Sequence, residues 1–446
     1  MQSISNARRD GLLFLLLGCA VLVSFGPLLE RISPVAMIDF KLPYYSTRCL
    51  LNHSDPYDGV DVIPAYRDGG EVALLKMVEG SPNSFRLVYF PTIFPFVVPF
   101  ALLPFGVAHI IWLAFILCGL ILASFLIWNT SAGYAPVTAG FLIGFMLANS
   151  ELVVMIGNPA GIAISLCVVA AWCFVKDTLA PLGVVCLAVG LLLKPHDVGM
   201  VWLYFLLAGR VYRKRALQSL AVVIVVGLPA VLWVSHVAPN WTTELHSTLL
   251  SNSAHGHPDD PGPTSSGAHQ LGMMVNLQTA LSAIKDDPSF YDPVSYVVCG
   301  ALLFAWCLIS IKGRPTPTRT WLALAAIAAL TMLPLYHRQV DTKLLLLTVP
   351  ACARLCSEGK RLGRVAFIVT FAGFVLTGDV PWVIVLHMIS HLRIPNTEFL
   401  NKIIMAGQMC PVPLILLLIC VFYLYVYAQR TFAAEGSSRY VDAVQS

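Results

Sequence analysis

Charged residues are scarce in this chain. Only 12% of its 446 residues are Asp, Glu, Lys or Arg, whereas 57% are hydrophobic and the mean hydropathy is +0.77. A soluble domain carries about 25% charged residues, so the composition excludes that class and places the chain in a bilayer. The apolar runs of about 17 to 25 residues are long enough to cross the hydrocarbon core as helices. The alternating pattern of an outer-membrane barrel is missing from the sequence.

The sequence also lacks the spacing of a disulfide framework or a zinc site. Most of the 12 cysteines lie singly inside apolar runs, without a CxxC pair, and we interpret them as small core residues. Basic residues gather beside the ends of apolar runs, in RVYRKR (210–215) and RLCSEGKRLGR (354–364). Clusters in such places indicate orientation in the membrane, so no nucleic-acid partner is expected.

Hydropathy and the positive-inside rule together predict an all-α polytopic membrane protein, a single domain over residues 1–446, with about twelve crossings. The predicted spans are 11–29, 88–105, 107–128, 135–150, 157–175, 179–209, 216–236, 294–311, 320–336, 343–355, 364–386 and 409–428. With Arg8 and Arg9 inside, the basic clusters and both termini fall on the cytoplasmic side. A cleaved signal peptide is the alternative for the first span, but no small-x-small cleavage site follows it.

Three long connections then face outward, at 30–87, 237–293 and 387–408. The span 179–209 is unusually long and carries LLLKPHDVG at its centre. Pro195 has no amide hydrogen, so we expect one kinked helix. Two separate spans are the alternative, which would move the 210–215 cluster outside.

The second outward loop contains SNSAHGHPDDPGPTSSGAHQ, which is rich in Gly, Pro, Ser and His. Such a composition predicts a partly flexible loop that is solvated or covers substrate. A metal site is the alternative, although the helical spacing of ligands is missing. Its ligands would be His255, His257, Asp259, Asp260 and His269.

The first outward loop opens with MIDFKLPYYSTRCLLNHSDPYDG, residues 37–59. Pro43 suits the first turn of a helix, and apolar residues follow at helical spacing. We therefore predict a short amphipathic helix at the outer interface, with Tyr44 and Tyr45 at headgroup level. Asp39 stands at the start of this helix, where an acid is either a cap or a chemical group.

Further polar residues fall near the same face. YHRQVDTK supplies His337, Arg338, Asp341 and Lys343. Cations at that depth either snorkel or bind a lipid phosphate. Lys194 and His196 lie at the centre of 179–209, where an ionisable group is costly unless it faces a cavity or a partner. Asn158, by contrast, is expected at an interface.

One reaction suits an outward carboxylate with nearby cations. Sugar transfer from a polyprenyl phosphate needs a base for the acceptor hydroxyl, whereas the lipid phosphate is already a good leaving group. Cations would stabilise the charge that grows on that phosphate. The alternatives are a transporter or flippase, with polar residues spread across the midplane, and a polymerase or ligase of lipid-linked glycans.

The stretch DFKLPYYSTRCLLNHSDPYD resembles the first-loop signature of glycosyltransferase family 87. These membrane enzymes of GT-C fold include polyprenyl-phosphate-mannose-dependent mannosyltransferases. The Asp39-Phe40 pair, the two tyrosines and the later Asp55-Pro56-Tyr57 match in type and order. VYFPTIFPF, LLLKPHDVG and LPLYHRQVDTKLLLL are similar to later segments of the family.

The resemblance implies an inverting transfer of a hexose, foremost mannose, from a polyprenyl-phosphate donor to a glycan, glycolipid or lipid-linked acceptor. The site would face outward from the plasma (inner) membrane. Asp39 takes the role of general base, and His337 matches the family's late histidine. No metal or other cofactor is expected, because GT-C enzymes of this kind commonly work without one. The residues expected near the donor phosphate and its lipid are Arg338, Lys194, Lys343, Tyr44, Tyr45 and His196.

Overall fold

The structure, a computed structural model, describes residues 2–77, 85–265, 274–313, 315–381, 384 and 406–445. Within these residues it is built of helices, so the prediction of an all-α membrane protein is confirmed. His269 and most of the predicted loop 387–408 lie outside the described residues. Five described helices are long and apolar enough to cross a membrane: α1 (Gln2–Ile32), α6 (Phe105–Ser131), α12 (Arg210–Val237), α15 (Pro288–Lys312) and α21 (Pro411–Gln445).

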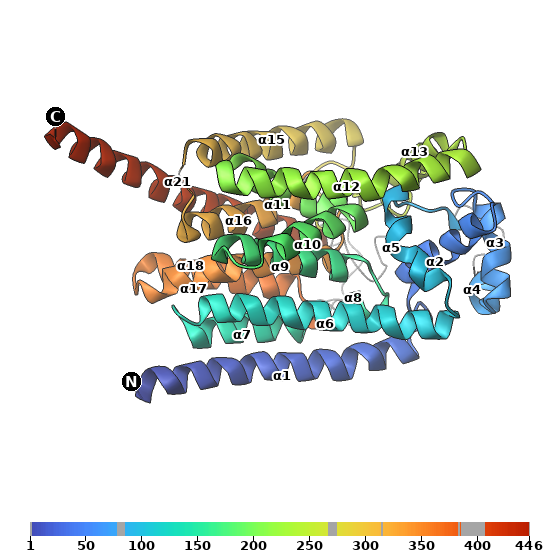
Figure 1. Ribbon diagram of the computed structural model, residues 1–446, viewed down its shortest axis with the longest axis horizontal. Helices are drawn as coiled ribbons and strands as arrows, with labels where there is room; N and C mark the ends of the chain where they lie inside the picture. The colour runs from blue at the N-terminus through green and yellow to red at the C-terminus, as the bar shows by residue number, and fades with distance from the viewer. Residues whose placement is uncertain are drawn as a thin grey trace, which may run out of the picture.

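Shorter helices complete the bundle. Those packed among the long helices are α7 (Pro136–Leu147), α8 (Glu151–Met155), α9 (Ala160–Lys176), α10 (Ala180–Leu193), α11 (Pro195–Leu207), α16 (Pro317–Thr331), η3 (Gln339–Thr348), α17 (Val349–Ser357) and α18 (Arg361–Leu376). The connections hold α2 (Ile38–Leu51), α3 (Gly59–Asp68), α4 (Val72–Met77), η2 (Pro91–Ile93), α5 (Phe94–Ala101), α13 (Trp241–Ser253) and α14 (Leu277–Ser282). The first-loop helices α2 to α5 gather at the end opposite the two chain ends (Figure 1).

Residues 88–105, predicted as a span, do not form one. The segment holds η2 and the eight-residue α5, because its prolines interrupt the helical hydrogen bonds. It packs beside α2, where the Tyr44 hydroxyl donates to the Leu103 carbonyl at 2.7 Å. The following helix α6 begins where α1 ends, since His109 lies 3.3 Å from Glu30. The segment therefore starts and finishes at the same end of the bundle.

Residues 179–209 form two helices, which corrects the prediction of one kinked span. α10 and α11 are separated by Lys194 alone. Leu192, at the end of α10, lies against Gly227 in the middle of α12. The Phe205 ring, near the end of α11, has returned to 5.0 Å from the Phe174 ring on α9. The proline thus ends one helix and begins another that runs back beside it.

The first correction removes one passage of the chain along the bundle and the second adds one. The basic clusters therefore still share one end of the molecule. Arg215 pairs with Asp177 after α9, and Arg354 donates to the Tyr134 hydroxyl at 3.1 Å. The chain ends marked N and C lie at this same end (Figure 1). The predicted topology requires this grouping, and its position on the cytoplasmic side stays a prediction.

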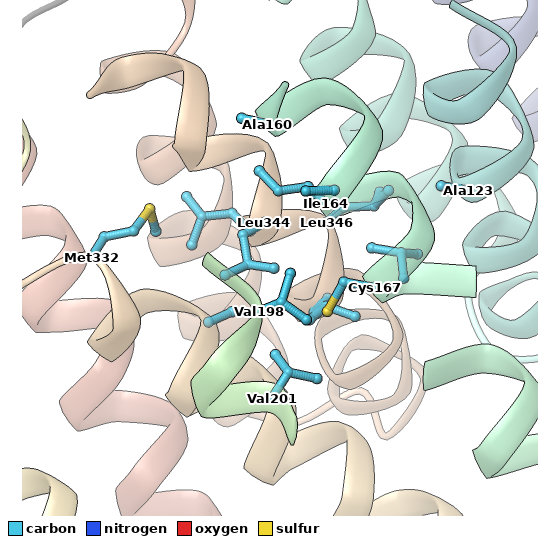
Figure 2. Packing of buried hydrophobic residues seen from close by; sticks show 14 of the residues in the cluster. Ala123, Ala160, Ile164, Cys167, Val198, Val201, Met332, Leu344 and Leu346 are labelled. Atoms are coloured by element: carbon cyan, nitrogen blue, oxygen red, sulfur yellow. The ribbon is translucent and has the colours of Figure 1, made fainter. Parts of the chain in front are cut away.

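The helix η3 carries polar residues into the core. All ten of its residues are buried, and a 3₁₀-helix of this length is uncommon. Figure 2 shows Leu344 and Leu346 of η3 beside Ile164 and Cys167 of α9 and Val198 of α11. These apolar contacts fix η3 against the helix pair that meets at Lys194.

Glycines allow α1 to pack closely against α7. A Cβ atom at Gly140 would overlap the Gly11 carbonyl, and one at Gly18 would overlap the Gly144 backbone. Inside a bilayer, small residues of this kind let two helix backbones approach each other.

We expect Gly140→Ala to destabilise the protein, because the added methyl forces the two backbones apart at a cost of about 1–3 kcal/mol. The thermal unfolding midpoint in detergent measures the effect. Gly300→Ala is the matched control, since a Cβ at Gly300 on α15 meets nothing within 4 Å. Equal midpoints for the two variants would show that the close approach does not stabilise the fold.

Candidate active site

Four buried ionisable side chains meet where α11 and η3 begin. The Lys194 ammonium donates to Asp341 and lies 3.3 Å from Asp197. Nε2 of His337 lies 3.2 Å from the second oxygen of Asp197. Each of the four side chains belongs to a residue at most 6% exposed. Buried charges are costly unless they are paired, and here each acid lies beside a basic group.

Local structure places the two acids. Asp197 lies in the first turn of α11, where the helix dipole favours a negative charge. Asp341 lies in the first turn of η3 and accepts a hydrogen bond from the Arg338 backbone at 2.8 Å. That bond uses one carboxylate oxygen and leaves the other for Lys194.

His337, in the connection before η3, is fully buried. Its Nδ1 lies 3.2 Å from the Leu335 carbonyl, which can only accept, so Nδ1 carries a hydrogen. Burial lowers the pKa of His337, but the hydrogen bond and negative charge of Asp197 outweigh burial and raise it above its ordinary value. The negative charge of Asp197 therefore favours the protonated form of the ring.

A partly exposed rim, formed by Asp39, Tyr89, His196, Tyr336 and Arg338, surrounds this cluster. Asp39 is half-buried in the first turn of α2. Its carboxylate accepts a hydrogen bond from the Asn158 side chain at 2.6 Å. Burial raises the pKa of the Asp39 carboxyl, although Asn158 and the positive charges of Arg338 and Lys194 oppose the shift.

The second outward loop reaches the rim through Asp259. Nη2 of Arg338 donates to Asp259 at 2.8 Å, and its Nε donates to the Tyr336 hydroxyl at 2.5 Å. These two bonds fix the plane of the guanidinium beside Asp39. Its side chain stays 30% exposed, so a ligand can still reach it.

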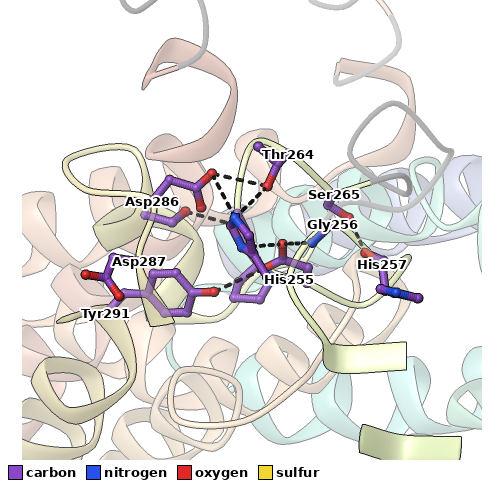
Figure 3. Close-up of polar contacts among 12 residues, drawn as sticks. His255, Gly256, His257, Thr264, Ser265, Asp286, Asp287 and Tyr291 are labelled. Atoms are coloured by element: carbon purple, nitrogen blue, oxygen red, sulfur yellow. Dashed lines mark hydrogen bonds and ion pairs between the residues drawn. The ribbon is translucent and has the colours of Figure 1, made fainter. Parts of the chain in front are cut away.

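A polar network folds the segment that carries Asp259 (Figure 3). Nδ1 of His255 lies 3.1 Å from Asp260, and its Nε2 lies 3.9 Å from Asp286. The Tyr291 hydroxyl of α15 donates to Asp260 at 3.1 Å. Two of the residues weighed above as metal ligands, His255 and Asp260, are thus paired with each other, and they anchor the loop to α15.

A family model described as glycosyltransferase family 87 matches residues 87–336, more than half of the chain. The chain belongs to glycosyltransferase family 87. Searches of curated proteins and of solved structures returned no match. The resemblance recognised in the sequence is therefore confirmed, and the protein is a multi-pass membrane glycosyltransferase. The match includes Lys194 and Asp197, whereas Asp39 precedes it and His337 follows it.

Two residues expected near the donor lie outside the cluster of this glycosyltransferase. Tyr44 and Tyr45 are fully buried, and their rings pack against Phe105. The Tyr44 hydroxyl donates to the Leu103 carbonyl, and the Tyr45 hydroxyl lies 3.5 Å from Glu71. The helix α2 is correspondingly a packed element with eight of its 14 residues buried, which corrects the prediction of an amphipathic helix lying at the interface.

Lys343 belongs to a second buried network. Its ammonium donates to the Asn149 carbonyl at 2.8 Å and lies 3.3 Å from Asp379. Asp379 in turn accepts from the Leu152 backbone at 2.7 Å. These contacts join η3 to α8 and to the end of α18, so Lys343 does not join the cluster around Lys194.

Residues His196, Asp197, His337 and Asp341 also form a potential metal-binding set. One ligand atom from each lies within 4.8 Å of the others, and imidazole with carboxylate suits several divalent ions. The Lys194 ammonium already contacts both carboxylates. A divalent ion could use these ligands only after displacing that ammonium.

Sequence reasoning placed Asp341 in the outward cluster but missed its pairing with Lys194, and it missed Asp197 and Asn158 as partners. Asp197 lies three positions after Lys194, and an intramembrane lysine needs such a partner, so this signal was present. Asn158 was expected at an interface, whereas it donates to Asp39 across 119 positions of sequence. No local pattern indicates that pairing, because it depends on how α2 meets the start of α9.

Proposed function

We propose that this glycosyltransferase moves a hexose, foremost mannose, from a polyprenyl-phosphate donor to a hydroxyl of a glycan, glycolipid or lipid-linked acceptor. The observation that supports the proposal is a half-buried carboxylate, Asp39, whose charge interacts with that of an accessible guanidinium, Arg338. A base and an anion-binding group at one place are what this transfer needs. The transporter alternative has less support, because the family match describes a transferase.

The reaction is a single displacement with inversion. One oxygen of Asp39 is held by Asn158, and the other accepts the proton of the acceptor hydroxyl. The acceptor oxygen then bonds to the anomeric carbon while the bond from that carbon to the phosphate oxygen breaks. Its electron pair leaves with the polyprenyl phosphate, whose growing charge Arg338 stabilises. The proton on Asp39 passes to water.

The remaining residues support these two groups. His337 is fully buried, with Nδ1 3.2 Å from the Leu335 carbonyl and Nε2 3.2 Å from Asp197, so we assign it to positioning Asp197 rather than to proton transfer with substrate. Lys194 gives the buried cluster its positive charge, and His196 lies on the rim beside it. Tyr44, Tyr45 and Lys343 take structural roles.

The proposal places the reaction at the outer face of the plasma (inner) membrane. In a GT-C arrangement of about twelve crossings, the basic end with both termini faces the cytoplasm. The site at the other end then meets lipid-linked donor at headgroup depth.

Product analysis tests the function directly. Purified protein is incubated with a panel of polyprenyl-phosphate sugars and membrane glycan acceptors, and the products are identified by mass spectrometry. We expect a new glycosidic bond and free polyprenyl phosphate. Solute or lipid movement in liposomes without any such bond would favour the transporter alternative.

Asp259→Asn is expected to raise the KM for the donor about tenfold with a smaller change in kcat. The variant weakens a charge-assisted bond that orients Arg338, and such bonds contribute about 1.5–3 kcal/mol. Asp259→Glu should recover most of the affinity. The exposed His257 on the same segment supplies the control His257→Gln. An unchanged donor KM in Asp259→Asn would contradict the positioning role.

The pH dependence of kcat/KM should show an acidic limb above the ordinary carboxyl pKa of 3.8, because burial raises the pKa of Asp39. A general base works when deprotonated, so activity falls as pH drops through the raised pKa. Arg338→Gln should move the limb to higher pH, since Arg338 lowers this pKa. If the limb lies at the same pH in the native protein and in Arg338→Gln, then it does not report the titration of Asp39.

A further inference from the structure

A cavity of about 200 Å³ lies at the basic end of the bundle, opposite the candidate active site. It opens among the last residues of α6 and α9, the first residues of α16, the length of α17 and the middle of α21. Its lining includes the cationic side chains of Lys176, Arg354 and Arg430, and Glu358 is the acid among the lining residues. The lining therefore carries a net charge of +2 at neutral pH. Its volume equals that of about seven water molecules, which is enough for a phosphate ester group.

Arg354 is fixed in a manner that leaves part of its guanidinium unused. Nη1 donates to the Tyr134 hydroxyl, and the guanidinium lies over the Tyr134 ring at 5.2 Å. Nε is buried and has no hydrogen-bond partner among the described residues. Nη2 makes no hydrogen bond among the described residues and is not buried, so this guanidinium, held in one plane, still offers a donor to the oxygens of a phosphate group.

The positive charge of this cavity is largely uncompensated. Arg430 pairs with Glu358 at 2.5 Å, so Lys176 and Arg354 carry the excess. The segments from α6 and α16 contribute hydroxyl groups, from Thr130 and Thr318, and no acid. Snorkelling toward lipid headgroups explains an exposed lysine such as Lys176, but it does not explain an arginine that is fixed against Tyr134 and leaves Nη2 without a partner among the described residues.

Part of the cavity wall is apolar. Trp321, Leu322 and Leu355 line the cavity. The aromatic side chains of Tyr425 and Phe432 are exposed within about two turns of Arg430 on α21. A ligand with an anionic head and an apolar portion could therefore contact the basic side chains with its head and these apolar side chains with the rest.

We propose that this cavity binds a phosphate-bearing anion. Two sources share this chemistry, the headgroup of an anionic phospholipid and a soluble phosphate ester. The site is separate from the candidate active site and does not rest on the proposed function.

Binding is measured on the purified full-length protein in a neutral detergent, by native mass spectrometry and by the thermal unfolding midpoint. The probes are short-chain phosphatidylglycerol, short-chain phosphatidylcholine and glycerol phosphate. We expect phosphatidylglycerol to bind and to raise the midpoint. Arg354→Gln should weaken its binding about tenfold, the loss of roughly one charged hydrogen bond.

Two further variants separate binding from folding. Lys176→Gln changes an exposed side chain and should weaken binding several-fold without lowering the midpoint of the free protein. Lys214→Gln removes an exposed charge at the same end but outside the cavity, and it should bind like the native protein. Tighter binding of phosphatidylglycerol than of glycerol phosphate assigns the lipid source, and equal binding assigns the soluble one. Unchanged affinity in both cavity variants, or equal binding of phosphatidylcholine, overturns the proposal.

Discussion

Asp39→Asn is expected to reduce kcat by about 10²–10⁴-fold while the protein still folds. Loss of a general base has an effect of this size, and asparagine keeps the shape and the hydrogen bond to Asn158 but cannot take a proton. The measurement is donor turnover in reconstituted liposomes, with the unfolding midpoint as the check on folding.

Asp68→Asn provides the matched control for that experiment. Asp68 is an exposed acid at the end of α3 in the same outward loop, so the variant makes the same chemical change away from the site. We expect native turnover from it. Near-native turnover of Asp39→Asn would remove Asp39 from the mechanism and with it the proposed proton transfer.

Lys194→Met should be the most destabilising single substitution in the site. It leaves the buried carboxylates of Asp197 and Asp341 without their shared cation, and removing one partner of a buried ion pair costs about 3–5 kcal/mol. The unfolding midpoint should drop strongly, and activity should fall with it. Lys76→Met, at an exposed lysine of α4, should change stability by less than about 0.5 kcal/mol.

A double variant tests whether Lys194→Met destabilises the protein by leaving buried carboxylates without a cation or by changing the packing. Lys194→Met combined with Asp341→Asn removes the cation and one of its two acids, so it should be more stable than Lys194→Met alone. Activity should stay low, because the double variant still lacks the positive charge of Lys194 that acts on Asp39 in the rim. A double variant less stable than both single variants would show that the ion pair is not what stabilises this region.

The composition and the length of the apolar runs were enough to predict a helical membrane protein, because a helix that crosses a bilayer must be apolar along the length of the hydrocarbon core. The first-loop motif was enough to predict the family. The error at 88–105 arose because hydropathy measures apolar length and ignores how prolines limit a helix. The error at 179–209 arose because Pro195 can either kink a helix or separate two, and tertiary packing decides between them.

Individual site residues were harder to predict than the fold. Asp39, Lys194 and Arg338 are charged groups in unusual places, and the sequence indicates them for that reason. Their partners come from distant segments: Asp341 lies 147 positions after Lys194. Tyr44 and Tyr45 were misjudged because an amphipathic pattern does not reveal whether the covering surface is lipid or protein.

The hairpin of α10 and α11 has a consequence for biogenesis. Its charged residues lie at the tip, and Asp341 is synthesised much later than Lys194. During insertion, Asp197 is therefore the acid available to Lys194, three residues away and 3.3 Å distant in the folded chain. We infer that the tip crosses the hydrocarbon as a nearly neutral ion pair, which lowers the barrier that two separate charges would meet. On this inference the same acid serves first in translocation and afterwards in the finished site.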